Sequence, residues 1–240
     1  MTAATDAAQQ TERLSELSRR YGLGGDAAEK LQSLLGVLVH DPLAPTAVRD
    51  PGRVLDDHIA DSLVALELEP TRSAMRVADL GSGAGLPGLP LAIARPSTRV
   101  ALIESAARKC AFIARAIREC GIQNAEVVQA RAESWPEGLE RFDLVTARAL
   151  APLEVVIEYA APLLRVGGAL VAWRGRRDHD AEAVAARAAS ELGMEPVEVR
   201  HVLPYEGAKH RHLHLMSKVR DTPSGFPRRP GMAAKRPLGR

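Results

Sequence analysis

Four closely spaced glycines are the residues of this sequence best suited to bind a ligand. They follow a short apolar run and an acidic residue, in the order Asp79, Leu80, Gly81, Gly83, Gly85 and Gly88. Glycine has no Cβ, so the backbone can turn sharply at these positions and approach a ligand where a side chain would collide. A glycine-rich turn directly after an apolar run is typical of loops that bind nucleotide-like ligands.

The register of the glycines decides between several ligands. Gly83, Gly85 and Gly88 match the G-x-G-x-x-G pattern of dinucleotide sites, but the glycine that directly follows the apolar run is Gly81. Counting from Gly81 yields G-x-G-x-G preceded by Asp79, whose carboxylate could lie near the cationic end of S-adenosylmethionine. We therefore favour this methyl donor over a dinucleotide. The alternative is a turn that only packs a helix on a strand, although so many glycines cost unfolded-state entropy without a return.

Three further polar segments follow predicted strands. Glu104 closes the second apolar run, where a carboxylate can accept both hydroxyls of a ribose, or else is a solvated strand-end group. Ala132 and Glu133 lie in a polar turn after the third strand, where a backbone amide and a short side chain could bracket an adenine. Arg148 ends the fourth strand and could clamp a donor carboxylate or a nucleic-acid phosphate, or be a surface arginine.

A parallel sheet wrapped by helices would position these segments, because from residue 75 onward short β-branched runs alternate with helical stretches. We expect strands at residues 76–80, 99–103, 126–129, 143–146 and 169–173, then a hairpin of 197–203 and 212–217. Helices are expected at residues 86–94, 106–120, 153–164 and 180–192. Ligands bind at the carboxyl ends of the strands in such sheets, so the loops after the first four strands should converge on one site.

The first 70 residues have a different pattern, with apolar residues at helical spacing over residues 11–21 and 26–40 and a third helix expected at 51–68. We expect a helical cap at residues 1–70 and the main domain at 71–219. His58, Asp61 and Ser62 have the spacing i, i+3, i+4 on the third helix. A buried polar network that locks the cap onto the main domain is favoured over direct contact with a target.

Composition limits the class of protein. A chain of 240 residues that is 46% hydrophobic can form a full core. No apolar run approaches the roughly 20 residues of a membrane span, and the first ten residues lack a secretory pattern, so we expect a cytoplasmic protein. Cys110 and Cys120 lie ten residues apart in one predicted helix, too far apart to bridge, and are expected to be reduced.

Charge is concentrated at the end of the chain. Residues 220–240 contain six basic residues and Asp221, a balance of +5, so the remainder carries −3 of the net charge of +2. Four prolines in the same stretch predict a disordered basic tail. Such a tail could contact nucleic-acid phosphates or be solvated without a specific role.

Several of these segments together resemble one family, the bacterial small-subunit ribosomal RNA guanine-N7 methyltransferases, also called the glucose-inhibited division protein B family. The similar segments are residues 57–63, 79–88, 130–133, 146–149 and 208–212, in the family's order, within about residues 47–218. The glycine loop alone marks only a methyltransferase, whereas residues 86–88 together with the segment around His58 are far more specific. Two segments depart from the family. Residues 44–46 are Ala-Pro-Thr instead of Asn-Leu-Thr, which leaves the contacts of that loop open, and Arg174-Gly175 replaces Lys-Gly with the charge kept.

The resemblance implies an enzyme that transfers a methyl group from S-adenosylmethionine to N7 of a guanine in the decoding region of 16S ribosomal RNA. It also implies a class I, Rossmann-like methyltransferase fold, with a mostly parallel sheet that ends in an antiparallel hairpin. Donor contacts would fall on Gly81, Leu86, Ala132, Glu133 and Arg148. The expected partner is 16S ribosomal RNA within the 30S subunit, and the expected state is a monomer.

This chemistry requires no catalytic acid or base. Guanine N7 has an in-plane lone pair and no proton, so the enzyme must only hold N7 and the methyl carbon in line, about 3 to 3.5 Å apart. The sequence has no convincing Ser/His/Asp or Cys/His set and no metal-ligand spacing. The candidates for a phosphate-binding rim, which could equally form a solvated basic face, are Lys109, Arg174, Arg176, Arg177 and Arg211.

Three other functions remain open from the residues alone. One is a class I methyltransferase that acts on a small molecule or a protein. Another is a nucleic-acid-binding protein with a non-catalytic donor site. The third is a nicotinamide-dependent dehydrogenase, as the literal G-x-G-x-x-G pattern suggests.

Overall fold

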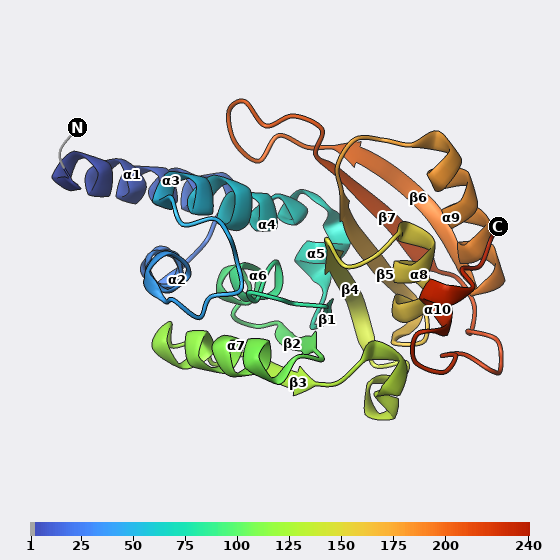
Figure 1. The fold of residues 1–240 in the computed structure, drawn as a ribbon. Helices are drawn as coiled ribbons and strands as arrows, with labels where there is room; N and C mark the ends of the chain where they lie inside the picture. The colour runs from blue at the N-terminus through green and yellow to red at the C-terminus, as the bar shows by residue number, and fades with distance from the viewer. Residues whose placement is uncertain (1–2) are drawn as a thin grey trace.

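A seven-stranded sheet forms the centre of the protein, and the computed structural model describes residues 3–240 (Figure 1). Its strands are β1 (Arg76–Leu80), β2 (Arg99–Glu104), β3 (Ala125–Gln129), β4 (Phe142–Arg148), β5 (Leu164–Arg174), β6 (Met194–His201) and β7 (His212–Lys218). They are arranged in the order β3-β2-β1-β4-β5-β7-β6. The first five are parallel, and β7 lies antiparallel between β5 and β6.

The expected five parallel strands and the hairpin are thus confirmed, although β4 and β5 are longer than predicted and β6 runs over Met194–His201 instead of residues 197–203. The chain reverses its direction of travel across the sheet at β1, which pairs with β2 on one side and β4 on the other. Leu80 is opposite Ile103 in β2 and Ala147 in β4, so these three strands end together. Such a switch point leaves a crevice at the carboxyl ends of the strands.

Helices cover both faces of the sheet because successive strand side chains point to opposite sides. One face, with Val77, Leu102 and Leu144, packs under α6 (Gly88–Ala94) and α7 (Ala107–Glu119). The other face, with Ala78 and Ile103, packs under α8 (Leu153–Ala160) and α9 (His179–Glu191). All four helices were expected. Cys110 and Cys120 are both buried and free, as expected.

The amino-terminal helices pack on the α6 and α7 side of the sheet (Figure 1). They are α1 (Ala3–Tyr21), α2 (Ala27–His40), α3 (Pro51–Val54), a π-helical turn (Leu55–Ala60), α4 (Asp61–Leu63), a 3-10 turn (Val64–Glu67) and α5 (Glu69–Ser73). The first helix is longer than predicted, and the predicted third helix changes type along its length. Leu31 and Leu35 of α2 belong to the same buried cluster as Leu89 and Phe112, so the cap shares its core with the sheet. The division at residues 70 and 71 stays a prediction.

The carboxyl-terminal segment corrects an expectation, since residues 220–240 are not a disordered arm. Arg228 forms a bidentate ion pair with Glu158 of α8, and Nη2 of Arg240 lies 3.0 Å from Oε1 of Glu154 on the same helix. Phe226 and Leu238 pack against the core beneath, and a short helix α10 (Met232–Lys235) forms despite the prolines. The physical reason is that both carboxylates of α8 are buried and require cations, which this segment supplies.

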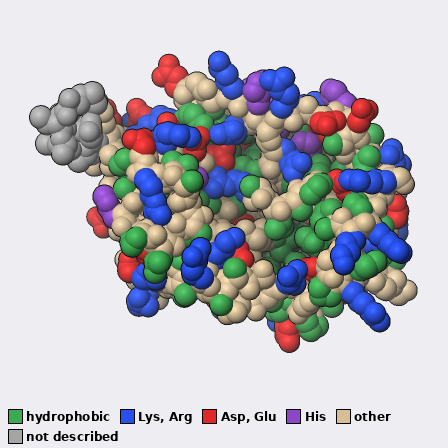
Figure 2. All heavy atoms as spheres, in the orientation of Figure 1, with side chains coloured by type: hydrophobic (Ala, Val, Ile, Leu, Met, Phe, Trp, Pro, Cys, Tyr) green, Lys and Arg blue, Asp and Glu red, His purple; other side chains and the backbone are tan. Residues whose placement is uncertain are grey.

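The surface carries both signs of charge. In Figure 2, Lys and Arg side chains are spread over the face in view with Asp and Glu between them, and the face is hollowed near its centre. Among residues 3–240, no helix is both long and apolar enough to cross a membrane.

Candidate active site

The glycine loop connects β1 to α6 and requires glycine for two different reasons. Gly81, Gly83 and Gly85 all have left-handed backbone angles, with φ of 64°, 58° and 82°. A Cβ on Gly81 would lie 2.5 Å from Cδ1 of Leu150, and one on Gly85 would overlap the side chain of Leu89. The loop is therefore specified by conformation and by close packing together.

Asp79 differs from the expectation that it faces the donor. Its side chain is fully buried and accepts hydrogen bonds from the Thr146 hydroxyl at 2.8 Å and the Gly88 amide at 3.2 Å. It lies on the same strand face as Val77, between the sheet and α6, because strand side chains alternate. Burial raises the pKa of Asp79 to about 6. Asp79 thus holds the loop from below through these two hydrogen bonds.

A cavity of about 330 Å³ lies at the carboxyl ends of the strands. It brings together four residues that the sequence predicted for the donor, namely Gly81, Glu104, Ala132 and Glu133. Leu86 is buried outside this lining, and Gly83 and Gly85 shape the loop without lining the cavity. The convergence of loops from β1, β2, β3 and β4 is confirmed, since each contributes lining residues.

Glu104 is a buried polar group of the cavity that is fixed by hydrogen bonds. The residue is only 6% exposed. One carboxylate oxygen accepts from the Gly83 amide at 3.2 Å and the other from the Ala106 amide at 2.9 Å. A carboxylate offers about four acceptor positions, so two stay available for the hydroxyls of a ribose. Lys109, predicted as part of a phosphate rim, lies instead at this cavity, with its Nζ 3.7 Å from Glu104.

Arg148 ends β4 as predicted but is not among the residues that line this cavity. Its Nη1 donates to Oδ2 of Asp61 at 2.9 Å and to the Asp57 carbonyl at 3.0 Å, both in the cap. Arg148 shares a strand face with Leu144 and Thr146, and that face is the one the cap covers. The indole of Trp173 on β5 adds a third bond, to the Asp61 carbonyl at 2.7 Å.

Of the three polar residues expected to lock the cap, only Asp61 spans the junction through its side chain. Ser62 donates to the His58 carbonyl at 2.5 Å, and His58 Nε2 lies 2.8 Å from the Thr46 hydroxyl, so both bond within the cap. The π-helical turn between residues 55 and 60 changes the angular spacing that a regular helix would give. Whether these residues contact RNA stays a prediction.

The loop between β6 and β7 closes on the same junction. Oδ1 of Asp57 accepts from the Tyr205 hydroxyl at 2.6 Å and from Nη2 of Arg211 at 3.2 Å. Nε of Arg211 lies 3.4 Å from Oδ1 of Asp61. Although burial opposes ionisation, hydrogen bonds from Tyr205 and Arg53 lower the pKa of Asp57 below its usual value. Asp57 and Asp61 therefore join the cap to two parts of the main domain.

Two of the remaining predicted rim residues bond to other groups of the protein, and the third is exposed. Arg174 donates to the Ala151 carbonyl at 2.9 Å, and Arg177 forms two bonds to Glu182 at 2.9 and 2.6 Å. Arg176 lies exposed beside His210, at 3.4 Å. The structure thus assigns Arg174 and Arg177 to contacts within the protein.

Sequence reasoning missed several side chains of the cavity, among them Leu150 and Tyr159. Ala149 has a positive φ of 53°, unusual for a residue with a Cβ, and this turn places Leu150 over Gly81. Such strain is often found at functional sites. Leu150 could have been found from the sequence, because it lies just after the fourth predicted strand, where loops were expected to reach the site. In the described part of the chain, no group of three His, Cys, Asp or Glu residues is arranged to hold a metal ion.

The strand order with an antiparallel seventh strand, the glycine loop after β1 and the acidic residue at the end of β2 define a class I S-adenosylmethionine-dependent methyltransferase. The family model described as "rRNA small subunit methyltransferase G" matches residues 39–213. The chain belongs to this family. The recognised family and its methyl donor, expected from the sequence, are thereby confirmed.

Relatives support this assignment over most of the chain. A protein named "Ribosomal RNA small subunit methyltransferase G" from Rubrobacter xylanophilus is 44% identical over 79% of this chain and 75% of its own length. A protein of the same name from Desulfitobacterium hafniense is 35% identical over 94% and 95% of the two chains.

Solved structures support the fold alone. The Methanococcus jannaschii fibrillarin pre-rRNA processing protein aligns with a TM-score of 0.53 at 17% identity, over 67% of this chain and 74% of that one. A branched-chain polyamine synthase mutein from Thermus thermophilus aligns with a TM-score of 0.59 at 18% identity, over 83% and 65%.

Proposed function

We propose that this protein transfers the methyl group of S-adenosylmethionine to N7 of a guanine in the decoding region of 16S ribosomal RNA. The substrate is the RNA within the 30S subunit, and the enzyme acts as a cytoplasmic monomer. The observation that carries the proposal is the family match, because residues 39–213 include both the glycine loop and the cap junction.

The cavity fits the donor on two structural grounds. Glu104 is a buried carboxylate with acceptor positions left for two ribose hydroxyls, and Gly81 lines the cavity with backbone alone, because the side chain of Leu150 packs where a Cβ would lie. Ala132 and Glu133 line the cavity beyond β3, where an adenine would lie. When bound, S-adenosylmethionine supplies an electrophilic methyl group on a sulfonium.

The protein's own contribution is positioning. Because guanine N7 carries no proton, no side chain has to remove one, and the rate depends on alignment of the two reacting atoms. Asp61 and the Asp57 carbonyl hold Arg148 at the end of β4, beside the loop that carries Leu150. The cap and the end of β4 are thereby held in one arrangement.

The test is to map 7-methylguanine in 16S ribosomal RNA from cells with the gene, without it, and with the Glu104→Ala variant. We expect one modified guanine, lost in the deletion strain and restored only by the wild-type gene. Purified protein should methylate isolated 30S subunits with S-adenosylmethionine. An unchanged RNA modification pattern, together with transfer to a metabolite or protein, would favour the alternative class of methyltransferase.

A further inference from the structure

A second hollow lies at the opposite end of the strands from the donor cavity. It has a volume of about 520 Å³ and opens where β1, β2, β3 and β4 begin. Its lining includes Ala101, Trp135 and Phe142. These residues pack with the α8 and α9 side of the sheet, as Ile103 of the donor cavity does. Both hollows therefore lie on one face, separated by the length of a strand of about five residues, or roughly 16 Å.

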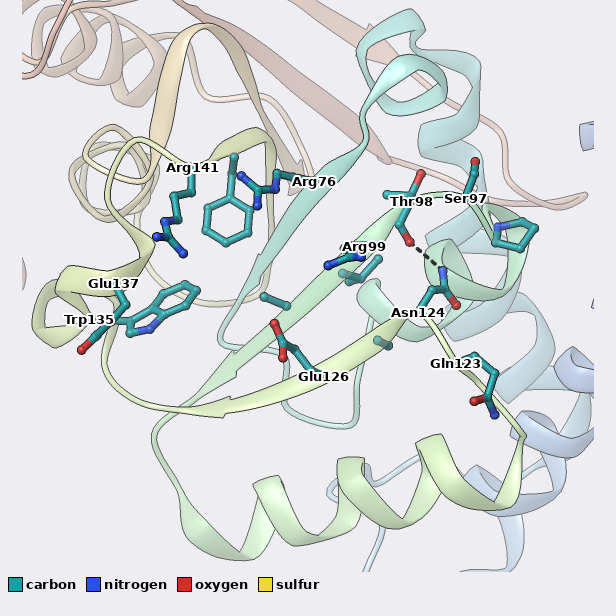
Figure 3. Close-up of a pocket in the computed structure, with 15 residues that line it drawn as sticks. Arg76, Ser97, Thr98, Arg99, Gln123, Asn124, Glu126, Trp135, Glu137 and Arg141 are labelled. Atoms are coloured by element: carbon teal, nitrogen blue, oxygen red, sulfur yellow. Dashed lines mark hydrogen bonds between the residues drawn. The ribbon is translucent and has the colours of Figure 1, made fainter.

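The hollow exists because the connection from β3 to β4 forms no full helix. Residues 130–141 contain only two 3-10 turns, Ala132–Ser134 and Pro136–Gly138. This short cover leaves β3 without a buried residue, whereas β1 and β2 are mostly buried. Trp135 lies between the two turns and packs against Phe142 with ring centroids 5.6 Å apart. The indole forms one wall of the hollow (Figure 3).

Three arginines enter this hollow from three different strand starts. Arg76 begins β1, Arg99 begins β2, and Arg141 directly precedes β4. All three are exposed, and within residues 3–240 none of their guanidinium groups has a hydrogen bond or an ion pair. Figure 3 shows them gathered around one space with Trp135.

The hollow also contains polar groups without positive charge, among them Ser97 and Gln123. Glu126 and Glu137 also line it, but neither forms an ion pair with the arginines. The amide nitrogen of Asn124 already donates to the carbonyls of Ala92, Arg95 and Thr98. Unpaired guanidiniums bind phosphate oxygens well, and an indole face stacks on any base. The three arginines and the indole therefore suit a nucleic-acid backbone with an adjacent base.

We propose that this hollow binds the phosphate backbone of the substrate RNA beyond the methylated nucleotide, through Arg76, Arg99 and Arg141, with a base stacked on Trp135. The inference rests on the proposed function and extends it by a second RNA contact, because both hollows open on the same face of the sheet. It assigns to this hollow a share of RNA affinity and no part in the chemistry.

The first experiment uses the full-length triple variant R76Q/R99Q/R141Q, with R19Q/R118Q/R229Q as a control of equal charge change. The control arginines are exposed and without ion pairs on other surfaces. With 30S subunits at 0.1 M salt, we expect the first variant to raise KM about ten-fold while kcat and donor affinity stay unchanged. The control should change KM less than two-fold. Equal effects of the two variants would overturn the proposal.

The second experiment does not depend on methyl transfer, so failure of the proposed function and of this inference can be told apart. Single-stranded oligouridylate is titrated into the protein while tryptophan fluorescence is recorded. We expect quenching that is lost in Trp135→Phe, and a salt dependence of binding whose slope falls by about 2 in the triple variant, since each phosphate contact contributes about 0.7. Quenching that persists in Trp135→Phe, or equally tight binding of uridine monophosphate, would overturn the proposal.

Discussion

Glu104 combines two tasks in one side chain, since it holds the glycine loop and presents acceptors to the cavity. We expect Glu104→Ala to weaken S-adenosylmethionine binding ten-fold or more, because both the ribose contacts and the loop anchor are lost. The measurement is isothermal titration calorimetry, with circular dichroism to show that the fold survives. Glu126→Ala, on the neighbouring strand at the other hollow, is the control and should leave donor affinity unchanged. Unchanged affinity in Glu104→Ala would contradict the site.

Asp79 makes stability depend on pH in a direction opposite to most carboxylates. Burial raises the pKa of Asp79 from 3.8 to about 6, so the folded protein holds a proton there that the unfolded chain has lost. The contribution of Asp79 to the free energy of unfolding is complete below about pH 4 and is lost as the pH rises through 6, in total about 3 kcal/mol. Asp79→Asn should therefore gain stability relative to wild type between pH 4 and 7.

Urea unfolding at several pH values measures this difference. Asp143→Asn is a control of opposite sign. Burial opposes ionisation of Asp143, but bonds from Arg165 and two backbone amides lower its pKa overall. The free energy of unfolding of the wild type should thus rise relative to that of Asp143→Asn as the pH rises through the acid range. A difference between wild type and Asp79→Asn that does not vary with pH would show that Asp79 stays ionised.

The connection between β1 and α6 offers a test at the scale of an element. Gly83 and Gly85 both have positive φ, but only Gly85 is also crowded, by Leu89 of α6. Gly83→Ala should cost about 1 kcal/mol for its left-handed backbone alone, and Gly85→Ala about 3 kcal/mol because Leu89 must also move. Chemical denaturation of the two variants measures both values. Equal costs would mean that conformation and not packing selects both glycines.

The docking of residues 220–240 on α8 is a property of the whole molecule. Glu158 is only 2% exposed, and its partner Arg228 lies 70 residues away in the sequence. Arg228→Ala should cost about 3 kcal/mol because it leaves a buried carboxylate unpaired, and adding Glu158→Gln should recover most of that loss. Thermal and urea unfolding test this cycle. Arg229→Ala, an exposed neighbour, should change stability by less than about 0.5 kcal/mol, and an equal loss in both single variants would count against a docked segment.

Much of the fold and part of the cavity lining could be predicted because they depend on neighbours in the chain. Alternating apolar residues define the strands, and glycine spacing locates the loop after β1. Gly81 directly follows β1 and Glu104 is the last residue of β2, so both lie at the carboxyl ends of strands, where the cavity is. The segments that resemble the family are likewise short runs of consecutive residues.

Other features depended on contacts between distant segments. The direction of Asp79 depends on the face that α6 covers, and Arg148 turns to Asp61, 87 residues away. The π-helical turn in the cap changes which polar residues meet the sheet.

The sequence by itself determined the strands and the glycine loop and favoured S-adenosylmethionine as the donor, because each depends on side chains a few residues apart. Only the tertiary structure decided that Arg148 joins the cap, that the basic carboxyl-terminal segment is docked, and that three arginines share one hollow. The physical reason is that buried charges and strand starts find their neighbours only after the sheet has brought distant segments together.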